Sequence, residues 1–248
     1  MKLYNFWRSG TSHRTRIALN LKGISTEYLA VHLGKNAHLS DDFKAVNPQQ
    51  LVPALVLDEA ESGVAGGYTL IQSPAIIEWL EERFPTPALL PTDPFERATV
   101  RAMAAVVGCD VHPINNKRIL DYLRQTFGAD ETAINAWCGT WIGAGFDALE
   151  ALIAQPASEV RYCFGNAPTL ADVYLIPQVE SARRFKVDLS RWPKIMAIDA
   201  HCATLPAFAP IIMDIGDTLR LLDAAPHATV VAVHLEALDH CTVARSTL

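Results

Sequence analysis

The segment WRSGTSHRTR, residues 7–16, determines how the chain begins to fold. It follows an alternating, aromatic-rich stretch at residues 2–7, typical of a short half-buried strand, and it leads directly into an apolar helix. Such a strand-to-helix corner points free backbone N–H groups and the positive end of the helix dipole at whatever lies in front of it. With the hydroxyls of Ser9 and Thr11 and the charge of Arg8, it predicts a place that stabilises an anion or an ionising thiol. A plain helix cap beside a solvated arginine explains the same residues, and the segment alone favours neither interpretation.

The composition of the chain is that of a globular protein. Half of the 248 residues are hydrophobic and 19% are charged, which permits one large domain or two modest ones. A net charge of −6 argues against binding to nucleic acid or a membrane surface, and no apolar run approaches the length of a membrane helix. The five cysteines are scattered without any metal-ligand spacing. We therefore expect a cytoplasmic protein with reduced thiols, no metal, no membrane contact and no nucleic-acid partner.

An α/β pattern covers residues 1–84. Residues 27–31 follow the first helix closely, so they are predicted to form a second strand that pairs in parallel with the first. Residues 54–57 and 68–71 are predicted to form a hairpin around the acidic, glycine-containing loop 58–67.

Two places in this α/β unit have features of a binding site. Pro53 opens a strand without donating a hydrogen bond, which leaves the backbone groups of Val52 free to bind an extended ligand. The alternative, an ordinary turn proline, is the commoner case. Ser73 is predicted to cap a helix in which Pro74 is the first residue, and Gln72 beside it offers an amide. Together they are able to hold a carboxylate at the helix N-terminus, although most capping serines serve only their own helix.

The second half of the chain shows helix signals only. Three prolines in residues 85–91 mark a linker, and residues 92–210 contain helical periodicity with capping boxes at 93–96 and 169–172. Residues 211–248 lose this pattern and are left unassigned.

Polar residues gather where Pro113 is expected to kink a helix. His112 and Asn116 lie on one face, and Arg118 is within two turns of them. A solvated face is the simpler interpretation of this cluster. Arg184 lies at the end of a later apolar helix. The usual interpretation of such an arginine is that it interacts with the helix dipole, and the alternative is that it faces a ligand.

The sequence contains no dinucleotide-binding, P-loop, serine-hydrolase or zinc-protease motif. Over residues 1–208 it resembles the zeta class of soluble glutathione S-transferases, and in particular the glutathione-dependent maleylpyruvate and maleylacetoacetate isomerases of that class. The segments that carry the resemblance are SGTSHRTRIALNLKG (9–23), NPQQLVPAL (47–55), IQSPAIIEWLEERFPTPALLP (71–91), GCDVHPINNKRIL (108–120) and PTLADVYLIPQVESARRF (168–185).

The resemblance implies a thioredoxin-like N-terminal domain, an all-helical C-terminal domain, a homodimer and glutathione as cofactor. It also implies roles for individual residues. By this resemblance, Ser9 and Thr11 support the glutathione thiolate, and Val52, before a cis Pro53, pairs with the glutathione backbone. Gln72 and Ser73 hold the γ-glutamyl carboxylate, with His38 and Gln50 as further candidates nearby, and His112 and Asn116 face glutathione. The two carboxylates of the substrate are bound by Arg8, Arg118 and Arg184.

The implied reaction is a cis–trans isomerisation of a small dicarboxylate diketo acid, maleylpyruvate to fumarylpyruvate, in gentisate catabolism. Thiolate addition turns the double bond into a single bond that rotates before the thiolate leaves, so glutathione is not consumed. One alternative is a maleylacetoacetate isomerase of tyrosine catabolism, which would differ from a maleylpyruvate isomerase only in the size of the substrate pocket. The other is a conjugating transferase, which needs an apolar substrate pocket beside the glutathione site. A non-catalytic interaction module is expected to have lost Ser9 or the arginines, and both are present.

The chain departs from the zeta-class pattern in two respects. Many zeta-class enzymes carry a cysteine in the first turn, whereas this chain has Ser9-Gly10-Thr11-Ser12, so no protein thiol competes there. The loop 58–67 and the residues after Pro210 do not match the pattern.

Overall fold

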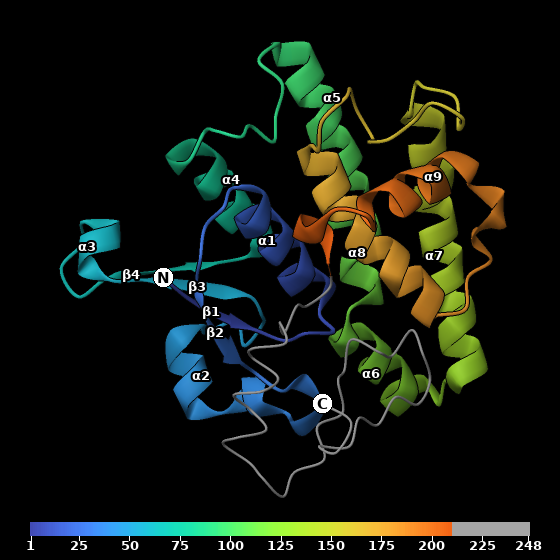
Figure 1. The fold of residues 1–248 in the computed structure, drawn as a ribbon. Coiled ribbons are helices and arrows are strands. Elements are labelled where there is room, and N and C mark those ends of the chain that lie inside the picture. The colour runs from blue at the N-terminus through green and yellow to red at the C-terminus, as the bar shows by residue number, and fades with distance from the viewer. Residues whose placement is uncertain (210–248) are drawn as a thin grey trace, which may run out of the picture. The chain divides into compact units, whose positions relative to one another are not determined.

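Four short strands form one mixed sheet at the start of the protein, of which the structure, a computed structural model, describes residues 1–209 (Figure 1). The strand order is β2-β1-β3-β4, with β1 and β2 parallel and the other two pairs antiparallel. This arrangement confirms the predicted parallel pair and the predicted hairpin. The strands are β1 (Lys2–Asn5), β2 (Glu27–Ala30), β3 (Ala54–Leu57) and β4 (Tyr68–Ile71).

Helices cover both faces of this sheet. On one face lie α1 (Gly10–Leu21) and α4 (Ser73–Arg83), and on the other lies α2 (Asp41–Val46) (Figure 1). The alternation of side chains along β1 explains the two layers, because Leu3 joins the main core whereas Tyr4 packs with Phe43 of α2 in a separate cluster. The first half of the chain is therefore thioredoxin-like, as the resemblance implied.

Two local predictions in this half were wrong in detail. The loop 58–67 contains a short helix, α3 (Glu59–Ser62), because Asp58 and Glu61 form a complete capping box around its first turn. Residues 36–46, in which the spacing of Leu39, Phe43 and Val46 predicts a short surface helix, form a regular helix only from α2 onward, and the 3₁₀ turns η1 (Leu33–Lys35) and η2 (Ala37–Leu39) precede it.

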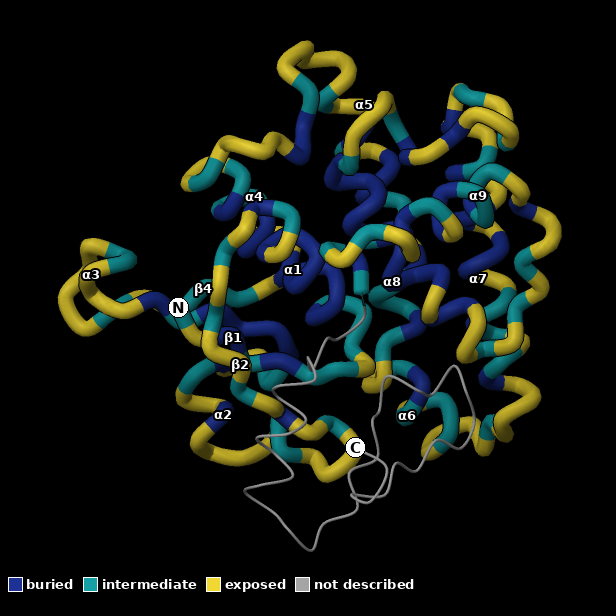
Figure 2. Tube along the Cα trace, in the orientation of Figure 1, coloured by how far each residue is buried: buried dark blue, intermediate teal, exposed yellow. Residues whose placement is uncertain are grey.

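The second half of the described chain is helical. The helix α8 runs through its centre with nearly every residue buried, and α1 packs against it (Figures 1 and 2). The elements are α5 (Pro94–Ala105), the π-helical segment η3 (Val106–Val111), η4 (Pro113–Asn115), α6 (Lys117–Phe127), α7 (Glu131–Leu152), α8 (Leu170–Arg184), η5 (Leu189–Arg191), α9 (Pro193–Cys202) and η6 (Pro206–Phe208).

One continuous core joins the two halves, and Met1–Phe208 forms one compact unit. The predicted domain limits, 1–84 and 92–210, therefore stay a prediction. The predicted tail, 211–248, lies outside the described residues.

A buried ion pair fixes the connection between the halves. Lys22, just after α1, donates from Nζ to the carboxylate of Glu81 at 2.7 Å and to the carbonyls of Phe84 and Pro87. Glu81 also accepts from the backbone N–H of Leu89. Because the lysine side chain is fully buried, these oxygens satisfy a charge that water does not reach.

The start of α8 is held by a second buried carboxylate. Asp172 forms the predicted capping box with Thr169, accepting from its N–H at 2.7 Å and its hydroxyl at 2.9 Å, and it also accepts from the N–H of Cys163 at 2.7 Å. It therefore anchors both α8 and the loop before it.

Replacing this carboxylate is expected to destabilise the fold strongly. Asp172→Ala leaves buried N–H groups unsatisfied and should lower the free energy of unfolding by about 3 kcal/mol, measured by urea denaturation. Asp130→Ala, which removes the exposed cap of α7, is the matched control and should cost about 1 kcal/mol. Equal losses in the two variants would contradict the anchoring role.

Candidate functional site

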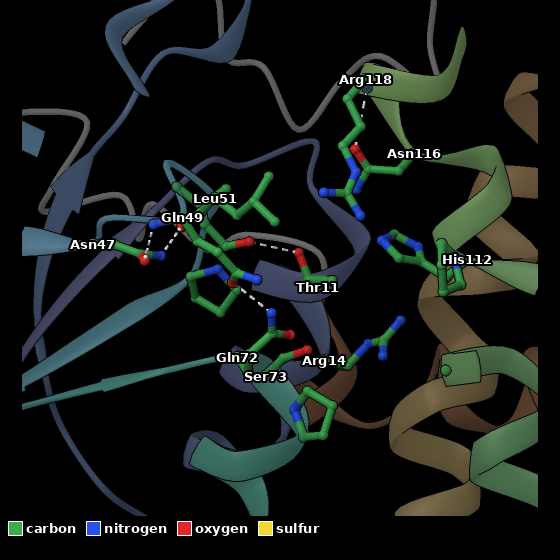
Figure 3. Close-up of a pocket in the computed structure, with 15 residues that line it drawn as sticks. Thr11, Arg14, Asn47, Gln49, Leu51, Gln72, Ser73, His112, Asn116 and Arg118 are labelled. Carbon is green, nitrogen blue, oxygen red and sulfur yellow. Dashed lines mark hydrogen bonds between the residues drawn. The ribbon is translucent and has the colours of Figure 1, made fainter. Parts of the chain in front are cut away.

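A cavity of about 210 Å³ opens between the thioredoxin-like half and the kinked helices of the second half (Figure 3). Its walls come from α1, residues 47–53, the start of α4, and residues 108–118. The structure brings together seven of the residues predicted to form the site: Thr11, Val52, Gln72, Ser73, His112, Asn116 and Arg118.

Two hydroxyls form a short hydrogen-bonded relay at the first corner. Thr11 donates from Oγ1 to the carbonyl of Val52 at 2.9 Å, and its Oγ1 lies 2.8 Å from Oγ of Ser9. Because Thr11 has one hydroxyl proton, Ser9 is the donor between the two. Ser9 also caps α1 by accepting from the N–H of Ser12, which confirms the capping interpretation, whereas its role in the site stays a prediction. Thr11 lines the cavity, and Ser9, which does not line it, is hydrogen-bonded to Thr11.

The backbone at Val52 is only partly free. The peptide bond between Val52 and Pro53 is cis, as the resemblance implied. The prediction that both backbone groups of Val52 are unpaired was wrong for the carbonyl, because the Thr11 hydroxyl donates to it.

Ser73 lies at the start of α4, but the prediction that it caps this helix was wrong. Gln72 occupies the cap position with a φ of +69°, and Ser73 is the first helical residue. The Ser73 hydroxyl is buried and has no hydrogen-bond partner among the described residues. A buried hydroxyl left unpaired at a helix N-terminus fits a bound carboxylate.

His112 lies at the kink, where the π-helical η3 ends just before Pro113. Its Nε2 is buried without a partner among the described residues. Burial, followed by the nearby charges of Arg14 and Arg184, lowers the pKa of His112 to about 3. The imidazole is therefore neutral at physiological pH.

Asn116 combines two roles at the same kink. Its side chain caps α6 by accepting from the N–H of Arg118 at 3.2 Å, and it also lines the cavity. The Arg118 side chain lines the cavity beside it (Figure 3).

The remaining predicted arginines lie next to each other outside the cavity lining. Arg184 donates from Nη1 to the carbonyl of Arg8 at 3.3 Å and from Nη2 to Ser181 at 3.2 Å. Arg8 is exposed and stacks on the Trp7 ring. The neighbouring Arg183 instead pairs with Glu180 and Asp199, whereas the charge of Arg184 acts on His112, which lines the cavity.

Two further candidates lie outside the lining. His38, in η2, is close enough to Lys117 and Asp121 of α6 for their charges to act on it, and burial is the main cause of its lowered pKa. Gln50 has a φ of +56° and is not among the lining residues, whereas its neighbour Gln49 lines the cavity and accepts from Nε2 of Gln72 at 2.5 Å.

Sequence analysis missed Arg14 as a cavity residue. Its side chain lines the cavity and is only 2% exposed. The available signal was its position one turn after Thr11, with Ile17 and Ala18 on the same helix face. A charged residue on a face that continues as apolar is expected to be buried.

Within residues 1–209 no group of three or more His, Cys, Asp or Glu side chains is arranged to hold a metal ion. In that same part of the chain, no helix is both long and apolar enough to cross a membrane.

Two family profiles match this chain: the glutathione S-transferase N-terminal domain over residues 8–83 and the C-terminal domain over residues 141–204. A maleylpyruvate isomerase from Ralstonia sp. is 70% identical over 208 residues, which are 84% of this chain and 94% of that protein. The chain belongs to the glutathione S-transferase family.

Solved structures narrow the comparison within this family. One is described as the holo structure of maleylpyruvate isomerase, a bacterial glutathione S-transferase of the zeta class. It is 70% identical in sequence to this chain, with a TM-score of 0.77, and the match covers 84% of this chain and 94% of that one. Another, a maleylacetoacetate isomerase from Anaeromyxobacter dehalogenans with bound dicarboxyethyl glutathione and citrate, is 40% identical, with a TM-score of 0.72 and coverage of 84% and 88%. The zeta-class resemblance is confirmed.

The neutral state of His112 makes stability depend on pH. Below about pH 6.5 the unfolded chain binds a proton at this residue that the folded chain does not bind until about pH 3, so His112 reduces stability as the pH falls. Between about pH 7.5 and 5, the wild type should lose about 1 kcal/mol more than His112→Gln, allowing for the partial exposure of the ring. Urea denaturation at both pH values measures this, and parallel pH profiles would refute it.

Proposed function

We propose that this protein is a glutathione-dependent cis–trans isomerase that converts maleylpyruvate to fumarylpyruvate. The observation that carries the proposal is the make-up of the cleft: a hydroxyl relay and an unpaired buried serine on one wall, and arginines on or beside the other. The 70% identical maleylpyruvate isomerase supports the choice of reaction.

The residues of the cleft fit glutathione. The buried Ser73 hydroxyl lacks a partner at the N-terminus of α4, where a carboxylate is favoured. The cis bond before Pro53 presents Val52 at the cleft wall, and Thr11 is beside it. Glutathione, when bound, supplies a thiolate whose reversible addition lets a conjugated double bond rotate.

The Thr11 hydroxyl stabilises this sulfur anion by donating to it, and Ser9 supports Thr11 by donating to its Oγ1. In the described structure the relay proton of Thr11 points at the Val52 carbonyl, and rotation of the hydroxyl redirects it into the cleft. A neutral His112 is suited to donate or accept a hydrogen bond without adding another cation.

Arg118, Arg184 and Arg8 bind the carboxylates of the substrate. Guanidinium groups match carboxylates in a bidentate geometry, and they also stabilise the negative charge that develops on the substrate when a nucleophile adds. An apolar compound would gain little from these groups, which favours a dicarboxylate isomerase over a conjugating transferase.

A maleylacetoacetate isomerase is the second candidate, since relatives with that name align over the same part of the chain. The higher identity to a maleylpyruvate isomerase favours the shorter substrate. We further propose that the protein is a cytoplasmic homodimer that acts in the breakdown of aromatic compounds.

The direct test mixes the protein with glutathione and maleylpyruvate and follows formation of the fumaryl product by absorbance and chromatography. We expect isomerisation that requires glutathione without consuming it, and slower turnover of maleylacetoacetate. Faster turnover of maleylacetoacetate would select the second candidate, and a stable glutathione conjugate of maleylpyruvate would refute the isomerase.

Arg184→Ala should raise KM for maleylpyruvate about tenfold, because one carboxylate loses a charged partner, while Kd for glutathione changes less than about twofold. Arg183→Ala is the matched control, since this neighbour pairs with Glu180 and Asp199 instead. Steady-state kinetics and calorimetry give both constants. An equal loss of both affinities in Arg184→Ala would remove this residue from the substrate clamp.

A further inference from the structure

The segment η3, which leads into the kink, is wound as a π-helix rather than as an α-helix. Its last bond runs from the N–H of His112 to the carbonyl of Val107, five residues earlier, at 2.9 Å. Such turns are rare and are found frequently at functional sites. Because a π-helical turn contains more residues than an α-helical turn, it changes the side of the helix on which the following residue lies. The residue that follows η3 is His112, which lines the cavity.

Two glycines allow η3 to pack closely between α7 and α8. Gly108, inside η3, lies against α8, and a Cβ on it would be only 2.8 Å from Cε1 of Tyr174. Gly145 of α7 lies against the last residue of η3, and a Cβ on it would be 2.3 Å from Cγ2 of Val111. Real Cβ atoms essentially never come closer than 3.0 Å to a neighbour. A larger residue at either position would therefore displace η3 or the helix beside it.

The two neighbouring side chains have little room to move aside. Val111 is β-branched, so its χ1 is restricted, and it is buried. Tyr174 is also buried, and the guanidinium of Arg14 stacks on its ring, with Cζ 4.2 Å from the ring centroid. Extra atoms between such groups force off-rotamer side chains or backbone shifts. The position of η3 is therefore sensitive to a single added methyl group on either side.

Gly145 differs in this respect from the other glycines of α7. A Cβ on Gly139 would have Cγ2 of Val187 at 3.9 Å as its nearest neighbour, and a Cβ on Gly143 would be 3.9 Å from Cζ2 of Trp192. Both are ordinary van der Waals distances, so alanine fits at these two positions. Since glycine weakens a helix interior relative to alanine, its presence at position 145 needs a reason, and the close approach of η3 supplies one.

The turn places the His112 imidazole at the start of α1. A Cβ on Gly10 would be 3.4 Å from Cε1 of this ring and 3.6 Å from its Nδ1, so that edge of the ring faces the first residue of α1. The ring points toward the side of the cavity where Thr11 lies (Figure 3). Its Nε2 is buried and has no partner among the described residues, and the charged groups that act on it are Arg14 and Arg184. A shift of η3 would move this nitrogen relative to the hydroxyl relay.

We infer that Gly108 and Gly145 are positioning residues for His112. By admitting η3 between α7 and α8, they fix the imidazole at the first corner of the cleft. Both act through the turn and not through a side chain. The inference rests on the proposed function in taking this cleft as the place of reaction, but not on the identity of the diketo acid.

Nuclear magnetic resonance of protein labelled with ¹³C-histidine tests the inference without use of the reaction. The resonance of His112 is assigned by its absence from the spectrum of His112→Gln. In the wild type it should not titrate between about pH 5 and 8, because burial lowers the pKa of His112 to about 3. In Gly145→Ala the displaced ring meets more water, so its pKa should rise and the resonance should titrate within this range. A resonance that stays constant in this variant, or that titrates in the wild type, would overturn the inference.

Gly139→Ala is the matched control, because it adds the same methyl group to the same helix at a place that has room for it. It should leave the His112 resonance as in the wild type, and a titration there would count against the inference.

Val111→Ala provides a rescue of Gly145→Ala. It removes the atom nearest to the new methyl group and leaves Cγ1 of Val106 at 3.5 Å and Cβ of residue 111 at 3.8 Å. The double variant should therefore show the same His112 resonance as Val111→Ala alone. A double variant that titrates more than Val111→Ala would contradict the proposed contact.

Kinetics separate a positioning role from general destabilisation. Gly145→Ala should lower kcat for maleylpyruvate about tenfold, because a displaced polar group is misaligned with the reacting atoms. KM should change less than about twofold, since the arginines that bind the substrate are untouched. Gly139→Ala should keep both constants within about twofold of wild type. A loss in Gly145→Ala that appears only in KM would refute the positioning of His112.

Gly108→Ala acts on the other side of η3 and provides a second test should Gly145→Ala fold poorly, as judged by thermal unfolding. It should produce the same titration of His112, and a constant resonance would contradict the inference. If the resonances behave as expected but the wild type does not isomerise maleylpyruvate, the proposed function is refuted and the positioning role of the two glycines stands.

Discussion

The packing of α1 between the sheet and α8 is the interaction on which the cleft depends. Every residue from Ser12 to Leu19 is buried, so this helix has no solvent face in its middle. Its first residue, Gly10, lies against the kink: a Cβ there would be 3.4 Å from Cε1 of His112 and 3.9 Å from Cβ of Pro177. The hydroxyl relay from one half and the polar kink from the other are thereby held on facing walls.

The cleft differs in charge from the chain that forms it. The protein has a net charge of −6, yet among residues 1–209 no aspartate or glutamate lines the cavity, whereas Arg14 and Arg118 do. Such a local concentration of positive charge attracts small anions. Glutathione and a dicarboxylate are both anions, so one electrostatic arrangement serves cofactor and substrate.

Much of the fold was predictable because its signals are local. The parallel pair, the hairpin, the helix that begins at Ser73 and the capping box at Asp172 follow from short patterns in the sequence, and the structure confirms them. The loop 58–67 was misread because a single capped turn is too short to give helical periodicity.

The site was less predictable because its decisive features depend on tertiary contacts. Whether Ser73 caps its helix depends on the backbone of the residue before it, and the left-handed conformation of Gln72 makes Ser73 the first helical residue. Arg14 was missed because arginines are seldom buried, and the apolar residues that follow it on its helix face do not show by themselves that Tyr174 of α8 packs against it.

A crystal structure with glutathione and a slowly reacting dicarboxylate analogue is the most direct test of this account. It should place the sulfur within about 3.5 Å of the hydroxyl oxygen of Thr11 or Ser9, with Arg118 and Arg184 directed at the carboxylates of the analogue. A sulfur bound away from both hydroxyls, or both arginines turned away from the analogue, would contradict it.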